Sequence, residues 1–174
     1  LSLTYFSGSF GALIRNLGVT YTGARLQSRE YLKEALKNPT SIAHLVNGRY
    51  YLARRQHEEA VVELERALAL DPNNPANIAA MANTLSFTGR QKEAEDLINR
   101  AIRLDPHNPG RYLYLLGGIQ FCMGNLEEAA TLVEKGLRIN PELTASAAWL
   151  IATYGLIGKG KEARAALEIY TKGR

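Results

Sequence analysis

A short phrase recurs four times along this chain at a nearly constant spacing, and no other feature constrains the fold so strongly. The phrase is EEA or KEA, and its evenly spaced copies stand at 58–60, 92–94, 127–129 and 161–163. The alanines that close the four copies are 34, 35 and 34 residues apart. A period of about 20–50 residues is typical of arrays in which one supersecondary unit is copied along the chain. The sequence therefore predicts a protein built from stacked repeats.

Each copy of the phrase lies at the start of the second of two helical stretches. In the first stretches, apolar residues recur every three or four positions, as at Ile78, Met81, Ala82 and Leu85. A small residue follows seven positions after the first three phrase alanines, and a proline follows after twelve: Ala67, Ala101 and Gly136, then Pro72, Pro106 and Pro141. Proline cannot donate a backbone hydrogen bond, so each proline is expected to end a second helix. The small residues predict close packing of stacked pairs, because one short pair cannot bury its apolar face alone.

One unit carries the whole pattern in order: Gly48, Tyr51, Ala60, Leu64, Ala67 and Pro72. This set resembles the tetratricopeptide repeat. The resemblance covers about residues 41–174 and implies an all-α fold, a right-handed superhelical solenoid of antiparallel helix pairs. It implies four units, at about 41–74, 75–109, 110–143 and 144–174. His44 and Asn47 stand where the family has a large aromatic residue and Leu, so we expect a looser first helix there.

Residues 1–40 fit the repeat less well. SREYLKEALKNP at 28–39 predicts a second helix with a proline stop, and LSLTYF predicts the end of a first helix. The segment between them is longer than a normal turn and is rich in Gly and Ser at its start. Two interpretations stay open for 1–40: a degenerate N-terminal repeat with an insertion, or a frayed cap.

The first residue of the chain predicts that it is a fragment of a larger protein. It begins with Leu1 rather than Met. The run from AAMANTLSFTGRQKEAEDL to NPGRYLYLLGGIQFCMGNLEEA also looks like repeat segments of bacterial multidomain cyclase-like or regulatory proteins. That likeness carries over no catalytic residue.

Charge and cysteine content exclude several classes of function. The net charge of +4 is small, and basic residues are scattered among acidic ones, so no nucleic-acid partner is predicted. The longest apolar stretch, 147–158, is too short to cross a membrane, so this segment is not expected to insert into one. A single cysteine, Cys122, excludes an intrachain disulfide. It leaves the compartment open, with the cytoplasm favoured.

No arrangement of residues predicts catalysis, a cofactor or a metal site. GLIGKGKE at 155–162 matches the start of a phosphate-binding loop, but Glu162 stands where that loop needs the Ser or Thr that binds Mg²⁺. The histidines, His44, His57 and His107, have no metal-ligand spacing. The glutamates of EEAVVELE are expected on a solvated outer helix face. Two interpretations stay open for Cys122: a small buried hydrophobe, or a thiol that faces the groove.

The least repetitive residues of the first helices are the candidates for binding, because first helices line the concave side of such a solenoid. Helical phase places on that side Arg49, Leu52, Asn83, Phe87, Arg111, Tyr114 and Phe121. In the fourth unit it places there only Ala145, Ala148, Ala152 and Leu156. Aromatic rings offer flat contact area, and Arg holds a carboxylate at two points. The sequence thus predicts a scaffold, not an enzyme, that binds a peptide or helix of a partner protein through an acidic group.

Two alternatives to a peptide-binding scaffold stay open. The last helix, KEARAALEIYTKGR, is expected to expose Leu167, Ile169 and Tyr170, which favours self-association into a homodimer. In the second alternative, the segment is a regulatory part of a larger protein and stands beside a catalytic domain outside this chain. Family members that hold chaperone C-terminal tails carry a Lys, Asn, Asn, Lys, Arg set. The matching residues here are Leu45, Arg49, Ala80, Arg111 and Leu115, so capture of such tails is not expected.

Overall fold

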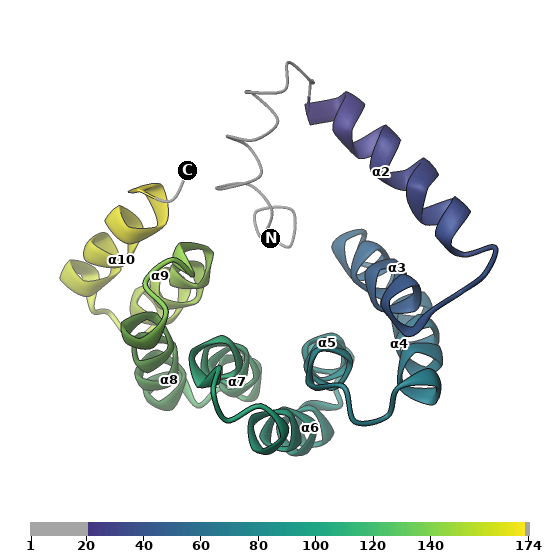
Figure 1. The fold of residues 1–174 in the computed structure, drawn as a ribbon. Coiled ribbons are helices and arrows are strands. Elements are labelled where there is room, and N and C mark those ends of the chain that lie inside the picture. The colour runs from purple at the N-terminus through teal and green to yellow at the C-terminus, as the bar shows by residue number, and fades with distance from the viewer. Residues whose placement is uncertain (1–20, 173–174) are drawn as a thin grey trace. The chain divides into compact units, whose positions relative to one another are not determined.

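The structure is a computed structural model that describes residues 21–172. This part of the chain is helical throughout, as the sequence predicts, and consecutive helices form antiparallel pairs joined by short turns (Figure 1). The helices are α2 (Tyr21–Ala35), α3 (Ser41–Ala53), α4 (His57–Leu70), α5 (Pro75–Leu85), α6 (Gln91–Leu104), α7 (Pro109–Met123), α8 (Leu126–Ile139), α9 (Ala147–Leu156) and α10 (Gly160–Lys172). A short 3-10 helix, η2 (Thr144–Ser146), precedes α9.

The chain divides into two compact units between Pro72 and Asn73. In unit 1, α3 packs on α4 and α2 contacts α3. Unit 2 contains three successive pairs, α5 with α6, α7 with α8 and α9 with α10. Within unit 2, α6 also packs on α7, and α8 on α9, so each pair is buried against the next. Unit 2 therefore shows the stacking that the periodicity predicts.

The helix ends confirm the role predicted for proline. Helices α4, α6 and α8 each stop two residues before a proline, and the residue between is not helical. Asp71, which precedes Pro72, has φ −146° and ψ 84°. The proline ring disfavours helical geometry in the residue before it, so the helix cannot continue. Asn74 then caps α5 by accepting hydrogen bonds from the backbone of Ala76 and Asn77.

The turn within each pair places one residue in the left-handed backbone region. The four residues are Arg55, Gly89, Gly124 and Gly158, with φ of 60°, 81°, 86° and 76°. Their spacing repeats that of the phrase alanines. Glycine adopts this conformation without a steric penalty, whereas a residue with a Cβ does not. Unit 1 therefore carries backbone strain at Arg55 that the pairs of unit 2 avoid.

Helix α2 begins earlier than the sequence predicts. It starts at Tyr21 rather than Ser28 and ends at Ala35, four residues before Pro39. Residues 21–27, YTGARLQ, contain no proline and only one glycine, so nothing in them stops a helix. The predicted end of a first helix at LSLTYF, and most of the predicted insertion, lie outside the described residues.

A buried polar cluster replaces the loosening expected in the first helix of unit 1. The ring Nδ1 of His44 lies 2.8 Å from Oε2 of Glu63, and both side chains are buried. Asn47 also hydrogen-bonds Glu63. Arg66 reaches the other carboxylate oxygen at 2.5 Å. Two sequence expectations are thus corrected: His44 and Asn47 join α3 firmly to α4, and Glu63 lies inside rather than on the solvated face, because polar partners satisfy its charge.

Small residues bring the helices together, as predicted. The phrase alanine Ala60 is fully buried, and so is Ala67. In unit 2, a Cβ on Gly117 would lie 2.6 Å from Cγ2 of Val133, and one on Gly136 would lie 2.9 Å from the carbonyl oxygen of Gly110. Helices α7 and α8 are therefore closer than side chains at these positions would allow.

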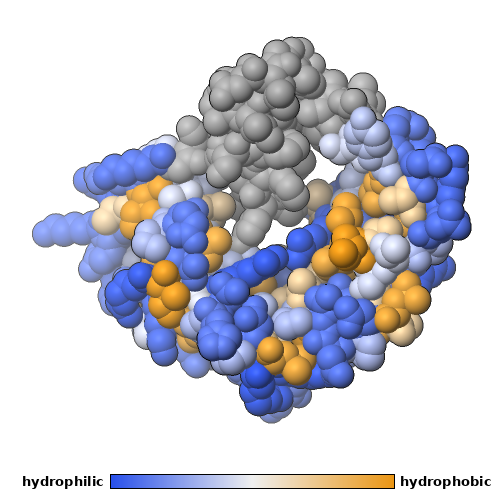
Figure 2. Space-filling model, in the orientation of Figure 1, coloured by the Kyte–Doolittle hydropathy of each residue, from blue (hydrophilic) through white to orange (hydrophobic). Residues whose placement is uncertain are grey.

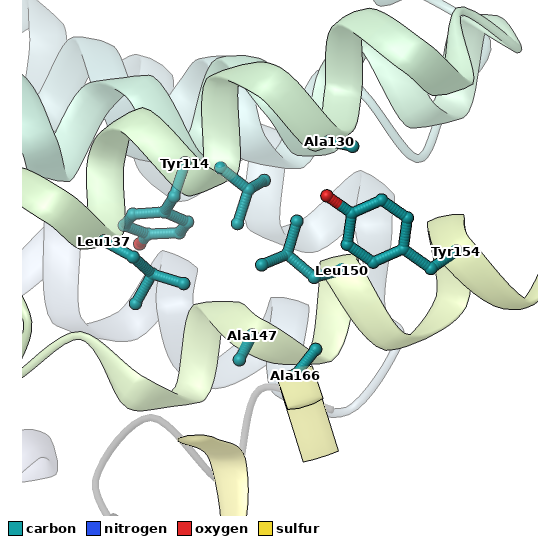
Figure 3. Close-up of a cluster of buried hydrophobic side chains, with 8 residues drawn as sticks. Tyr114, Ala130, Leu137, Ala147, Leu150, Tyr154 and Ala166 are labelled. Atoms are coloured by element: carbon teal, nitrogen blue, oxygen red, sulfur yellow. The ribbon is translucent and has the colours of Figure 1, made fainter. Parts of the chain in front are cut away.

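A cluster of buried apolar side chains joins α7, α8, α9 and α10 (Figure 3). It consists of Tyr114, Ala130, Val133, Leu137, Ala147, Leu150, Tyr154 and Ala166. The Tyr154 hydroxyl, at the edge of this cluster, donates a hydrogen bond to the Glu134 carboxylate. Outside the core, hydrophobic residues appear as small separate patches among hydrophilic ones (Figure 2). Scattered exposure of this kind is normal for a protein surface.

Candidate peptide-binding face

The helices of unit 2 form two rows (Figure 1). Helices α5, α7 and α9 form the inner row, in which α5 packs against α7 and α7 against α9. Helices α6, α8 and α10 form the outer row. We call the side of the inner row that points away from the outer row the inner face. The first helix of each pair therefore lines one face, which is where the sequence places the candidate binding residues.

Three aromatic side chains from successive helix pairs meet at the inner row: Phe121 lies on α7, Trp149 lies on α9, and Phe87 lies in the turn that follows α5. The ring centroids of Phe121 and Trp149 are 5.3 Å apart. Those of Phe87 and Trp149 are 6.5 Å apart, with an interplanar angle of 20°. Rings attract one another at centroid separations of about 4.5–7 Å, so Trp149 links the other two. We call Phe87, Phe121 and Trp149 the aromatic platform.

Gly118 of α7 gives the platform its position. A Cβ at Gly118 would come within 3.0 Å of two atoms of the Trp149 indole, so the indole lies directly on this glycine. Its neighbour Gly117 faces Val133 on α8 in the outer row. Successive helical residues point about 100° apart, so Gly118 points toward α9 rather than toward Val133, and the indole on it also packs against the core cluster of α7 to α10. Phe87 is 43% exposed, and the other two rings are half-buried.

Trp149 is the functional candidate that the sequence prediction missed. Helical phase placed Ala145, Ala148, Ala152 and Leu156 on the concave side of the fourth unit. That prediction counted helical positions from Ala145. In the structure Ala145 lies in the 3-10 helix η2, and α9 begins only at Ala147, so the count from Ala145 does not give the directions of the α9 side chains. The chain contains a single tryptophan, on a predicted first helix. A single tryptophan on a first helix could have marked Trp149 as a binding candidate from the sequence, because Trp is enriched at binding surfaces.

Tyr114 does not belong to the candidate site. Only 4% of its surface is exposed, and it lies in the cluster that joins α7 to α8, α9 and α10 (Figure 3). The prediction that its ring faces a ligand is therefore corrected. Tyr114 and Phe121 are both aromatic residues of α7. Their side chains point in nearly the same direction, within about 20°, but they lie about two helical turns apart along the axis. Tyr114 meets the α8 and α9 core at its level, whereas Phe121 meets the platform.

Arg111 is exposed at the start of α7. It precedes Gly118 by seven residues, close to two full helical turns, so both residues point the same way. Arg111 forms no ion pair with any side chain in the described part of the chain. Asn83 is half-buried on α5, and its carbonyl oxygen accepts a hydrogen bond from the Ser86 hydroxyl. The inner face thus presents one cation at a distance from the rings.

Arg49 and Leu52 lie on α3 in unit 1 and are half-buried. The other predicted residues, Asn83, Phe87, Arg111 and Phe121, lie in unit 2. The structure brings Phe87 and Phe121 together through Trp149 and leaves Arg49 and Leu52 in a separate unit. Their part in a common binding surface stays a prediction.

Cys122 lies on α7 one residue from Phe121 of the platform, and it is half-buried. Burial raises the pKa of its thiol, and a hydrogen bond from Ser86 offsets this rise only in part. At neutral pH the group is therefore the poorly nucleophilic thiol rather than the thiolate. Among residues 21–172, no three His, Cys, Asp or Glu side chains gather closely enough to hold a metal ion. In the same range, no helix is long and apolar enough to cross a membrane.

Comparisons with known proteins agree with this geometry. Family models described as "Tetratricopeptide repeat" match residues 22–75, 51–119 and 110–143. Together the three matches span 22–143. No curated protein matches the chain. The matches establish neither a cyclase-like parent nor a bacterial source, so both stay predictions.

Solved structures show the same fold at low sequence identity. PilW, described as a type IV pilus biogenesis factor, is 18% identical with a TM-score of 0.70, over 98% of this chain and 77% of that one. The Sgt2 tetratricopeptide domain from Aspergillus fumigatus is 24% identical with a TM-score of 0.57, over 70% and 81%. The first tetratricopeptide domain of Spaghetti (RPAP3), bound to an HSP90 peptide, is 20% identical with a TM-score of 0.57, over 68% and 96%. From its repeats, its stacked helix pairs and these matches, the chain belongs to the tetratricopeptide-repeat family.

Proposed function

We propose that this chain is a non-catalytic protein–protein interaction module whose unit 2 binds an extended segment of a partner protein on the inner face. One observation carries the proposal: the aromatic platform gathers three rings on the row of first helices, and Phe87 keeps 43% of its surface exposed. Partly exposed aromatic rings are typical of binding surfaces, because they provide a large contact area at a small entropic cost.

A similar structure supports binding on this fold. The RPAP3 domain is described with a bound HSP90 peptide. The fold can therefore hold an extended peptide, although the identity of 20% carries no residue of that site over to this chain.

The experiment selects ligands from a phage-displayed library of random peptides about 12 residues long on the purified chain. The most enriched peptide is then titrated against wild type, Phe87→Ala and Leu104→Ala by fluorescence anisotropy. Leu104 on outer helix α6 is the matched control, because it is 42% exposed against 43% for Phe87. We expect Phe87→Ala to raise Kd about 5- to 10-fold and Leu104→Ala to leave it within about twofold.

Trp149 provides a second, independent measurement. It is the only tryptophan in the chain, so intrinsic tryptophan emission reports on the platform alone. A bound side chain that displaces water from the indole should shift the emission to shorter wavelength. The proposal fails if no peptide is enriched over an empty resin. It also fails if the enriched peptides bind Phe87→Ala as well as wild type without altering the emission.

Exposed apolar residues on α10 favour self-association as a second candidate function. Leu167 is 48% exposed and Ile169 is 38% exposed on this helix. A second copy that covered them would bury apolar surface and so be stabilised. Light scattering across concentration tests this: a dimer should form at high concentration and be lost in Leu167→Glu. A strictly monomeric wild type would refute self-association.

A further inference from the structure

We propose that the inner face of unit 2 recognises a largely apolar segment of a partner protein that carries a single acidic group. In this proposal one bulky apolar side chain of the segment packs on the aromatic platform and a single nearby carboxylate pairs with Arg111. The inference rests on the proposed function and adds the chemistry of the ligand. Three observations carry it: the charge of the inner helices, the platform, and the spacing between the platform and Arg111.

The inner helices are almost free of charge. Their sequences are PANIAAMANTL for α5, PGRYLYLLGGIQFCM for α7 and AAWLIATYGL for α9. Arg111 is the one charged side chain in these three helices. The outer helices are dense in charge, as in QKEAEDLINRAIRL of α6 and LEEAATLVEKGLRI of α8. A segment with many charged side chains would lose the hydration of all of them on the inner face, whereas only one of them could pair with Arg111. Binding of an apolar segment is therefore favoured.

The platform supplies the anchor site. Its rings fix one another, and small residues surround them: Gly118 lies under the indole, and Ala152 follows Trp149 by one turn of α9. Ala152 is exposed, so the surface of α9 next to the indole is low and apolar. Leu156, one turn further along α9, is 66% exposed and extends the apolar surface. An apolar anchor of aromatic or Leu size fits this surface best, because burial of its area drives binding.

Helix geometry sets the distance between anchor and carboxylate. A rise of about 1.5 Å per residue places Arg111 about 10 Å from Gly118 and about 15 Å from Phe121 along α7. An extended peptide advances about 3.3 Å per residue, so its carboxylate lies about three to five residues from the anchor. An exposed guanidinium without an ion pair is available to hold it at two points.

This ligand differs from the peptide named for the RPAP3 domain. That peptide, SRMEEVD, has two glutamates and an aspartate within seven residues. A peptide of that kind needs several cations, and the inner helices of unit 2 offer only Arg111. The two ligand classes therefore make opposite predictions for the composition of the selected peptides.

The test uses the random peptide library above and reads the sequences it enriches on the full chain. We expect enriched peptides to share a Trp, Phe or Leu with one Asp or Glu about three to five residues away and few other charges. The best peptide is then measured against Arg111→Ala, Arg111→Lys and Arg103→Ala. Arg103 is the matched control, an exposed arginine on outer helix α6.

Arg111→Ala should weaken binding about 3- to 10-fold, Arg111→Lys should weaken it less, and Arg103→Ala should leave it unchanged. Replacing the peptide carboxylate with its amide should weaken binding to wild type by the same factor. It should not weaken binding to Arg111→Ala any further. Circular dichroism melts confirm that each variant folds. Phe87→Leu, which keeps apolar bulk, serves as a milder variant if Phe87→Ala melts early.

The outcomes separate this inference from the proposed function. Peptides with several acidic residues, or peptides that bind without shifting Trp149 emission, would overturn the inference and leave peptide binding intact. An apolar peptide that binds Arg111→Ala as tightly as wild type would also overturn it. If no peptide is enriched at all, the proposed function fails first.

Discussion

The imidazole of His44 on α3 lies 2.8 Å from the carboxylate of Glu63 on α4, and less than a tenth of either residue is exposed. In this family a large aromatic residue stands at the position of His44. Here a polar pair with Asn47 and Arg66 around it takes the place of apolar packing. A buried pair of this kind is costly to break, because removal of one partner leaves the other unsatisfied.

Glu63→Gln should lower the free energy of unfolding at pH 7 by about 1–3 kcal/mol. Burial acts to raise the pKa of Glu63, but hydrogen bonds from His44 and Asn47 and the nearby positive charge lower it overall. A lowered folded pKa means that the carboxylate stabilises the fold above its unfolded pKa of about 4.3. This contribution is lost as the pH falls through the folded value. Urea unfolding should be measured for wild type and Glu63→Gln from pH 3 to 7. The difference between their free energies of unfolding should become smaller as the pH falls. Glu65→Gln, at an exposed position in the middle of α4, should show little effect at any pH, and a difference for Glu63→Gln that stays constant would contradict the proposed charge effect.

Arg55→Gly should stabilise unit 1 by about 0.5–1 kcal/mol. Arg55 has φ 60° in the turn where the three later pairs have glycine. The substitution removes the strain of a Cβ in the left-handed region. Gly89→Ala is the reciprocal control: a Cβ there would meet nothing within 4 Å, so any loss of stability reports backbone strain alone. Thermal melts measure both, and equal midpoints for Arg55→Gly and wild type would argue against strain.

Gly117→Ala should destabilise unit 2 by about 1–3 kcal/mol, because its Cβ would lie 2.6 Å from Val133 and 2.9 Å from the carbonyl oxygen of Ala129. Gly155 in α9 is the matched control, since a Cβ there would meet nothing within 4 Å. Gly155→Ala should raise stability by up to about 1 kcal/mol through helix propensity. Chemical denaturation of the two variants gives both values. Similar losses for both would mean that α7 and α8 are not in close contact at Gly117.

Cys122 should react with iodoacetamide more slowly at pH 7.5 than a free cysteine does, because burial raises its pKa and lowers the thiolate fraction. Ser86→Ala should slow the reaction further, since the Ser86 hydrogen bond lowers that pKa. Mass spectrometry of the alkylated protein over time gives the rates. Full unfolding in urea should restore the ordinary rate. A folded rate equal to the unfolded one would contradict the burial argument.

Much of the fold could be predicted from sequence because its signals act locally. Pro72 ends α4 through its own ring, and Ala60 is buried because its slot in the repeat admits only a small side chain. These effects need no knowledge of distant residues. For the candidate site, the structure joins Phe87 and Phe121 through Trp149 and places Tyr114 in the core, and the role of Phe87 and Phe121 in binding stays a prediction.

By itself, the sequence determined the helix pairs and their proline ends, because local patterns encode them. It also determined the repeat length and the family, because the same pattern recurs every 34 or 35 residues. Only the tertiary structure decided which side of each helix is open. Packing against neighbouring pairs sets both the rotation of a helix about its axis and the level along it at which another helix covers it, and these decide whether a ring lies on a face or in a core. It therefore decided that Tyr114 is buried, that Trp149 rests on Gly118, and that Glu63 meets His44, nineteen residues away in the chain.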